Sequence, residues 1–94
     1  MDIKESKRKD LVATIIERIL LDISKETCSL VERRLFADYY CRFSDCYRHP
    51  EYLNAILKEI FGTNYFIITD KIKAELEKYT LDKKLVKFIE VLVK

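Results

Sequence analysis

The stretch Cys41-Arg-Phe-Ser-Asp-Cys46-Tyr-Arg-His49-Pro50-Glu-Tyr-Leu-Asn-Ala-Ile-Leu-Lys-Glu-Ile-Phe-Gly62 decides how this chain folds. It holds two of the three cysteines and the only histidine, proline and glycine among the 94 residues. Proline is favoured in the first turn of an α-helix and glycine readily ends one, so we predict a helix from Pro50 to Phe61 that stops at Gly62. The apolar residues expected at the centre of the fold are Leu53, Ile56, Leu57, Ile60 and Phe61.

A first helix is predicted near the start of the chain. Apolar residues recur there at i, i+4 and i+8, the spacing of one face of an amphipathic helix. This stripe consists of Leu11, Val12, Ile15, Ile16, Ile19, Leu20 and Ile23. The residues before it are polar and charged, so we expect 1–9 to form a frayed N-terminus.

A second helix is predicted between this stripe and the stretch from Cys41 to Gly62. Ser29 and Glu32 have the spacing of a capping box, which indicates a helix that begins between residues 27 and 30. We expect it to end between residues 40 and 43, and a connector to fill 41–49. Its predicted buried residues are Val31, Leu35, Phe36 and Tyr39.

Two more helices are predicted after Gly62. A 3-4-4-3 rhythm of apolar residues indicates a helix from about Asn64 to Tyr79, and Thr80 or Asp82 can cap a last one. The inward residues of the last helix are Leu81, Leu85, Phe88, Ile89 and Leu92, and the outward ones are Lys83, Lys87, Glu90 and Lys94. The sequence therefore predicts a single all-α domain over residues 1–94, folded as one compact bundle of about five helices.

The charge balance and the pattern of charges argue against a nucleic-acid surface and against membrane contact. The 18 basic and 16 acidic residues leave a formal net charge of +2, which argues against a surface dedicated to nucleic acid. Charges interrupt every apolar run well short of the ~20 residues that a membrane crossing needs, and the first ten residues lack the apolar core of a signal peptide. We therefore expect a cytoplasmic protein without membrane contact, whose cysteines stay reduced.

The helix pattern resembles a known family. The residues that carry the resemblance are Val31-x3-Leu35, then Asp45-x4-Pro50-Glu51-x-Leu53-x2-Ile56-Leu57-x2-Ile60-Phe61-Gly62, then Ile68-x3-Ile72-x3-Leu76. This pattern, over about residues 27–79, is similar to a small helical archaeal domain that is found alone and fused to signalling modules. That family has been proposed as an output domain of archaeal two-component systems. The resemblance implies a signalling role, with no assigned enzyme activity and no assigned catalytic residues. The chain departs from the family's pattern at Thr63-Asn64-Tyr65 and by its cysteines.

The cysteines and the histidine leave three interpretations open. Three thiols and one imidazole make a complete tetrahedral zinc set, and Cys41, Cys46 and His49 have a compact spacing. Cys28 is about 20 Å away from Cys41 along a continuous second helix, too far to share a metal with it. Without Cys28, a metal site or a disulfide between Cys41 and Cys46 stays possible on paper. We favour structural thiols with no metal and no cofactor.

Two further interpretations of the same region are nucleic-acid binding and catalysis. Aromatic residues interleaved with arginines can stack single-stranded bases, which makes nucleic-acid binding the alternative function. The residues concerned are Phe36, Tyr39, Tyr40, Phe43, Tyr47 and Tyr52, with Arg33, Arg34, Arg42 and Arg48. His49 has Asp45 and Cys46 nearby in sequence, but the connector offers no glycine-rich turn or oxyanion donors, so we expect no enzyme.

The first and last helices carry more apolar residues than one buried face can hide. An exposed apolar patch beyond a few hundred Å² is unusual in a monomer. We therefore expect a non-enzymatic interaction or signalling module that forms a homodimer across a two-fold axis, with a signalling protein as a possible further partner. The predicted interface residues are Leu21, Val91 and Val93.

Overall fold

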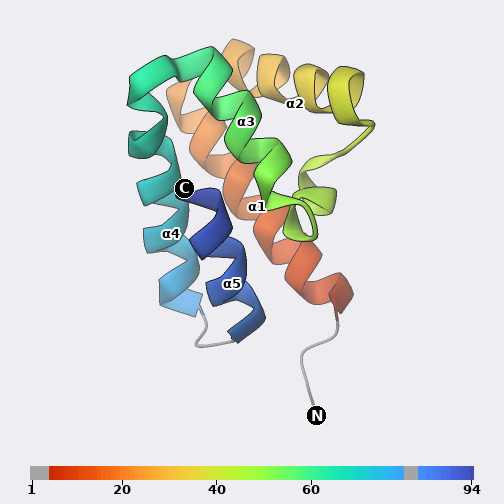
Figure 1. Cartoon of the computed structure of the whole chain (residues 1–94), viewed down its shortest axis with the longest axis vertical. Helices are drawn as coiled ribbons and strands as arrows, with labels where there is room; N and C mark the ends of the chain where they lie inside the picture. The colour runs from red at the N-terminus through yellow and green to blue at the C-terminus, as the bar shows by residue number, and fades with distance from the viewer. Residues whose placement is uncertain (1–4, 80–82) are drawn as a thin grey trace.

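The computed structural model of the chain describes residues 5–79 and 83–94 (Figure 1). The elements are α1 (Glu5–Ile23), α2 (Lys25–Tyr39), the 3-10 helix η1 (Phe43–Tyr47), α3 (Pro50–Phe61), the 3-10 helix η2 (Gly62–Asn64), α4 (Tyr65–Tyr79) and α5 (Lys83–Leu92). The described residues contain no strand, which confirms the predicted all-α class. Within them, no helix has both the length and the apolar character to cross a membrane.

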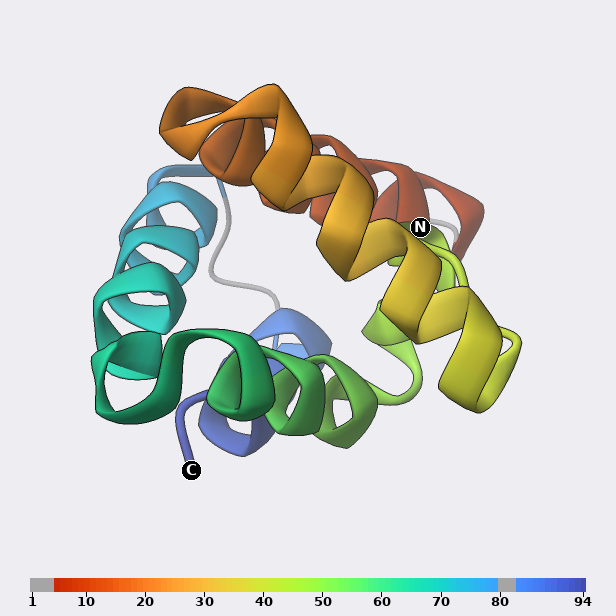
Figure 2. The same ribbon diagram turned by 90° about the horizontal axis from the view of Figure 1, so that it is seen from above.

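The helices do not form a simple parallel bundle. α2 lies across one end of the molecule, and α1, α3, α4 and α5 lie below it in the view of Figure 1. The view from above shows α2 running obliquely over that end, with α4 and α3 along two other sides (Figure 2). The predicted bundle of about five helices is therefore only approximately right, because α2 closes an end and the connector after it adds η1 to the packing.

One hydrophobic core draws on all of the α-helices and on η1. The predicted stripe of α1 is buried from Val12 to Leu20, whereas Ile23 at its end is exposed. In α3, Leu53, Ile56 and Leu57 are fully buried, and Ile60 and Phe61 are partly buried against the core. The remaining core of α4 and α5 consists of Ile68, Ile72, Leu76, Leu85, Phe88, Ile89 and Leu92, as predicted for the described residues.

The first helix begins earlier than predicted. α1 starts at Glu5, so residues 5–9 of the segment expected to fray are helical, and residues 1–4 lie outside the described residues. Arg8 in this turn is buried. The apolar pattern missed this turn because a long arginine stem can cover apolar surface although the residue counts as charged.

The second helix also begins earlier than predicted, because Ser24 caps it. The Oγ atom of Ser24 accepts a hydrogen bond of 3.0 Å from the backbone N–H of Thr27, and α2 starts at Lys25. The prediction took Ser24 to Thr27 as the end of the apolar stripe and used Ser29 as the cap instead. Ser24 is thus the one residue between α1 and α2, and serine is a preferred N-cap.

The connector after α2 is ordered around Asp45. The Asp45 carboxylate accepts a hydrogen bond of 3.0 Å from the backbone N–H of Arg42, and the Arg42 carbonyl accepts one from the N–H of Asp45. The Asp45 carbonyl in turn accepts from the N–H groups of Arg48 and His49. This local network holds η1, whose Phe43 and Cys46 are buried in the core. η1 packs against α1 and α3, so the connector is part of the core rather than a surface loop.

The predicted helix from Pro50 to Phe61 is confirmed at both ends. Gly62 has φ 59° and ψ −135°, a backbone conformation that side chains with a Cβ rarely adopt. This turn carries the chain through η2 into α4, whose predicted range over about 64–79 is also confirmed. The proposed caps of the last helix, Thr80 and Asp82, lie outside the described residues together with Leu81.

The C-terminal end of α5 is tied to α3 and α4. The side-chain amide of Asn54 donates a hydrogen bond of 2.7 Å to the carbonyl of Leu92. Lys58 and the Tyr65 hydroxyl both donate to the carbonyl of Lys94, each at 3.2 Å. These bonds satisfy carbonyls that a helix end leaves without an intrahelical partner, so they fix α5 against α3.

Leu57 tests the assigned core. Because its side chain is fully buried among residues of several elements, Leu57→Ala should lower the free energy of unfolding by about 2 to 5 kcal/mol. Chemical denaturation followed by circular dichroism measures this change. Lys71→Ala, at an exposed position of α4, is the control and should change stability far less. A loss below about 1 kcal/mol for Leu57→Ala would contradict the packing of α3.

Candidate functional site

The C-terminal end of α2 carries a strained residue. Tyr40 has φ 56° and ψ 34°, in the left-handed region, and it is the non-glycine residue with positive φ among those described. Its N–H bonds to the Phe36 carbonyl at 2.9 Å, and the Cys41 N–H bonds to the Leu35 carbonyl at 3.3 Å. The bond from Tyr40 to Phe36 is that of the αL motif at a helix end, in which glycine usually occupies the position of Tyr40. A left-handed residue with a Cβ destabilises the fold by about 1–2 kcal/mol, and such strain gathers at functional sites.

Two aromatic rings at this end of α2 are exposed to solvent. The side chain of Tyr40 is 80% exposed, and that of Phe36 is 52% exposed. The two rings lie edge to face with centroids 5.8 Å apart. The prediction that Phe36 is buried is therefore wrong, because one residue along a helix rotates a side chain by about 100° and carries Phe36 off the buried face of Leu35.

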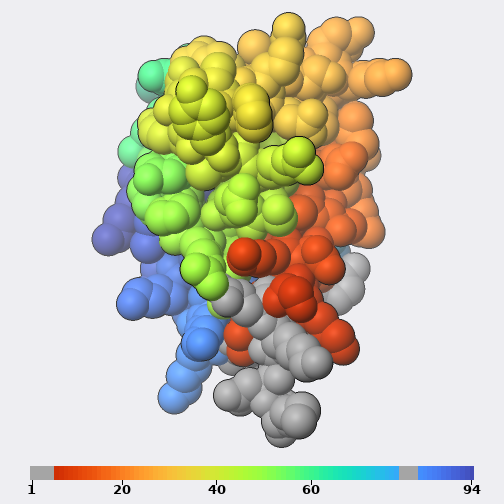
Figure 3. Space-filling view, turned by 90° about the vertical axis from the view of Figure 1, so that its right-hand side faces the viewer, coloured from red at the N-terminus to blue at the C-terminus, as the bar shows by residue number. Residues whose placement is uncertain are grey.

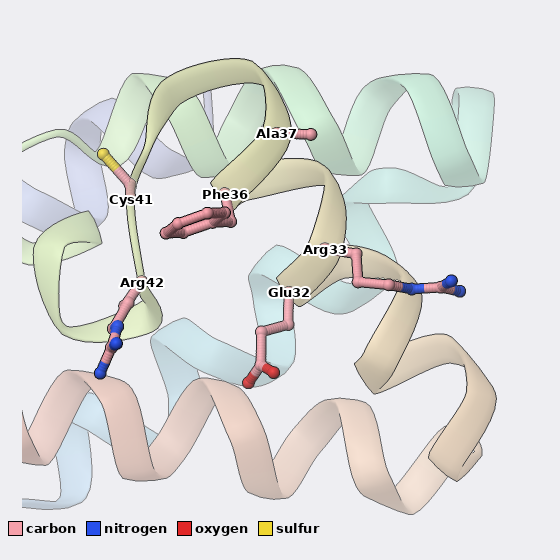
Figure 4. Close-up of a pocket in the computed structure, with 6 residues that line it drawn as sticks. All are labelled: Glu32, Arg33, Phe36, Ala37, Cys41 and Arg42. Atoms are coloured by element: carbon pink, nitrogen blue, oxygen red, sulfur yellow. The ribbon is translucent and has the colours of Figure 1, made fainter.

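A groove of about 590 Å³ opens beside the Phe36 ring and Cys41, the residue after Tyr40, and we call it the aromatic groove. It lies between α2 and the chain that descends from Tyr40 into η1 (Figure 4). The ring of Phe36 reaches across it, while the Cys41 sulfur points away from that ring. The residues that line the aromatic groove are Glu32, Arg33, Phe36, Ala37, Cys41 and Arg42.

The rim of the aromatic groove carries both signs of charge. Glu32 and Arg42 come from opposite sides and both point toward α1, whereas Arg33 points away along α2 (Figure 4). Arg34, on the neighbouring face of α2, is engaged elsewhere, because it hydrogen-bonds to Asp38 and to Glu59 of α3. The aromatic groove can therefore receive an apolar or aromatic side chain, with either charge accommodated at its edge.

The structure does not bring the candidate zinc ligands together into one site. All three cysteines are buried free thiols, so no Cys41–Cys46 disulfide is present. His49 is exposed; its ring stacks on Tyr52, and its Nδ1 lies 3.3 Å from a carboxylate oxygen of Glu51. Among the described residues, no group of three or more His, Cys, Asp or Glu side chains is placed to hold a metal ion. The metal candidates Cys41, Cys46 and His49 are therefore close in sequence without forming a ligand set.

The thiols lie in surroundings that disfavour the thiolate. Burial raises the pKa of Cys46, with smaller contributions from Cys41, Asp45 and Glu51. Burial also raises the pKa of Cys41 and of Cys28, again helped by nearby acidic groups. The Cys46 sulfur donates a weak hydrogen bond to the Arg42 carbonyl at 3.6 Å, and the Cys41 sulfur donates one to the Tyr39 carbonyl at 3.3 Å. A nucleophilic cysteine needs the opposite, a lowered pKa.

The predicted aromatic cluster divides into two parts. Phe43 is buried, and Tyr39, Tyr47 and Tyr52 pack against the core. Tyr39 and Tyr52 stack with centroids 4.2 Å apart and nearly parallel planes, which joins α2 to α3. Of the six rings, Phe36 and Tyr40 are the exposed ones, so the surface for stacking bases is smaller than the sequence suggested.

The predicted interface residues occupy separate places. Leu21 is 46% exposed near the end of α1, and Val93 is 36% exposed at the end of α5. Val93 lines a groove between α4 and α5, whereas Val91, which is partly buried, lines another groove beside η1 and the start of α3. Sequence analysis thus found exposed apolar residues on both terminal helices, but it missed Tyr40. The available signal was the helix end at Tyr39-Tyr40-Cys41, where no glycine is present to make the turn.

Comparison with known protein families, curated proteins and solved structures gives no match to this chain. The resemblance to the archaeal output domain therefore rests on the sequence pattern alone.

Replacing Tyr40 tests the strain at the end of α2. Tyr40→Gly and Tyr40→Ala both remove the ring, but only glycine adopts the left-handed conformation without steric conflict. Tyr40→Gly should therefore be more stable than Tyr40→Ala by about 1 kcal/mol, measured as the free energy of unfolding in urea. Equal stability of the two variants would show that residue 40 does not hold this conformation in solution.

The thiols give a pH-dependent prediction. Thiol titration of the denatured, unreduced protein should find three free groups, and elemental analysis should find no stoichiometric zinc. Because the pKa of the Cys46 thiol is higher in the folded chain than in the unfolded chain, the unfolded chain loses its thiol proton first as pH rises. Ionisation therefore favours the unfolded chain at pH values above the unfolded pKa. The free energy of unfolding should therefore fall as pH rises above about 8.5. Cys46→Ala should reduce that slope; an unchanged slope would contradict the burial of Cys46.

Proposed function

We propose that this chain is a non-enzymatic interaction module that self-associates, with a second copy bound at the aromatic groove. The observation that carries this proposal is Tyr40, whose ring is 80% exposed although its backbone conformation destabilises the fold. A fold that needed only a helix end here would be more stable with glycine. The resemblance to an archaeal output domain is the ground for a signalling role of such a module.

A second copy suits the aromatic groove because the surface is self-complementary. It offers both the exposed ring of Tyr40 and a groove that the neighbouring Phe36 ring lines. A two-fold axis brings the same surface of both copies together, so the exposed ring of one copy can enter the groove of the other. The mixed charges of Glu32, Arg33 and Arg42 fit the same arrangement, since each acidic group can face a basic one of the other copy.

The groove alone is too small for a stable dimer. A typical interface buries about 800 Å² on each partner, so this one has to extend along the solvent face of α2. That face carries the exposed Leu30 in addition to Phe36. α2 lies across one end of the molecule, where a second copy can approach without contacting α5 (Figure 2).

Light scattering after size exclusion tests self-association. At micromolar concentration the protein should have about twice the monomer mass of 11.3 kDa. Phe36→Glu should shift it to monomer because it places a charge against an apolar surface. Tyr40→Gly should do the same without loss of stability, which separates association from folding.

Val93→Glu is the matched control for this experiment. It adds the same charge at an exposed apolar residue just after α5, away from the aromatic groove, and should leave the dimer intact. If Val93→Glu dissociates the dimer and Phe36→Glu does not, the terminal helices form the interface and the aromatic groove is the wrong surface. A strictly monomeric wild type across the concentration range would refute self-association.

A further inference from the structure

A second groove, separate from the first, lies between η1, the start of α3 and α5. Its volume is about 280 Å³, and it shares no lining residue with the aromatic groove. Figure 3 shows η1 and the start of α3 beside α5 on this face of the molecule. We call it the basic groove; its lining includes Arg48, Glu51, Lys84, Lys87, Phe88 and Val91.

The walls of this groove concentrate positive charge. Arg48 comes from the end of η1, and Lys84 and Lys87 come from α5, against the single acidic residue Glu51. These four side chains carry a formal charge of +2 within one small groove. Charge of this sign attracts an anionic partner to the basic groove.

The floor of the basic groove is apolar. Phe88 and Pro50 are buried beneath it, and Val91 is partly buried at its side. An apolar floor within a basic wall accepts an apolar side chain flanked by carboxylates, because burial of the side chain supplies affinity and the charges supply orientation and encounter rate.

Nucleic acid fits this surface less well than an acidic peptide does. Single strands bind where exposed rings stack on bases, but here Phe88 is buried and Tyr47 is partly buried against the core. Glu51 also stands in the wall, where it repels a phosphate chain but can face a gap between acidic residues of a peptide.

We propose that the basic groove binds an acidic segment of another protein, with one apolar side chain inserted between Lys87 and the start of α3. This site goes beyond the self-association proposed above and does not depend on it, since the two grooves have no residue in common.

Fluorescence anisotropy with the full chain tests the site. The probe is a labelled peptide with the sequence Asp-Glu-Asp-Phe-Leu-Glu-Asp, and its affinity should fall as salt is added. Lys87→Glu should weaken binding about tenfold or more, because it reverses a charge in the wall. Lys73→Glu makes the same change at an exposed residue of α4 outside the groove and should retain wild-type affinity.

A second probe and a second variant test the apolar floor. A peptide with two serines in place of Phe-Leu should bind about tenfold more weakly, and Val91→Ser should weaken the original peptide but not the serine peptide. Circular dichroism confirms that each variant is folded.

Three results would overturn the proposal: no binding of the acidic peptide, binding that Lys87→Glu and Lys73→Glu weaken equally, or equal binding of both peptides. Tighter binding of a single-stranded oligonucleotide that displaces the peptide would also overturn it, in favour of a nucleic-acid site. None of these results bears on the mass of the protein in solution, so the two proposals fail independently.

Discussion

The burial of η1 against α1 is the constraint on which the rest of this structure depends. α2 lies across one end of the molecule and leaves the side of α1 uncovered, so the connector after α2 has to complete the core with Phe43 and Cys46. To reach that position the chain must leave α2 abruptly at Tyr39. The left-handed turn at residue 40 results from this demand on the path of the backbone, but the demand does not account for a tyrosine at that position, since glycine makes the same turn without strain.

Sequence patterns predicted the parts of the fold that depend on local chemistry. Pro50 and Gly62 marked both ends of α3, because proline fixes φ at a value that suits the first turn of a helix and glycine adopts the positive φ at which this helix ends. The apolar stripes located the cores of α1 and α5, because burial follows helical periodicity. The predicted start of α2 was wrong because both Ser24 and Ser29 can cap a helix, and the structure uses Ser24.

The candidate site was less accessible to sequence analysis. Tyr40 looked like one more packed aromatic residue, since nothing local requires a left-handed conformation in a tyrosine. The basic groove was also hidden, because Arg48 and Lys87 are far apart in the chain and meet only when α5 packs on α3. Near-neutral total charge argued against a broad basic surface, but it could not show where the small excess is gathered.

The single residue between α1 and α2 has a consequence for how the chain reaches its fold. With Ser24 alone as the connection, the two helices meet at almost no loop-closure entropy, so their crossing can form before distant segments are in place. The contact of α1 with α4 is different, since it joins segments separated by α2, η1 and α3. Like the contacts of α1 with η1 and of α3 with α5, it costs more loop-closure entropy than the crossing of α1 and α2, so we expect these long-range contacts to form later.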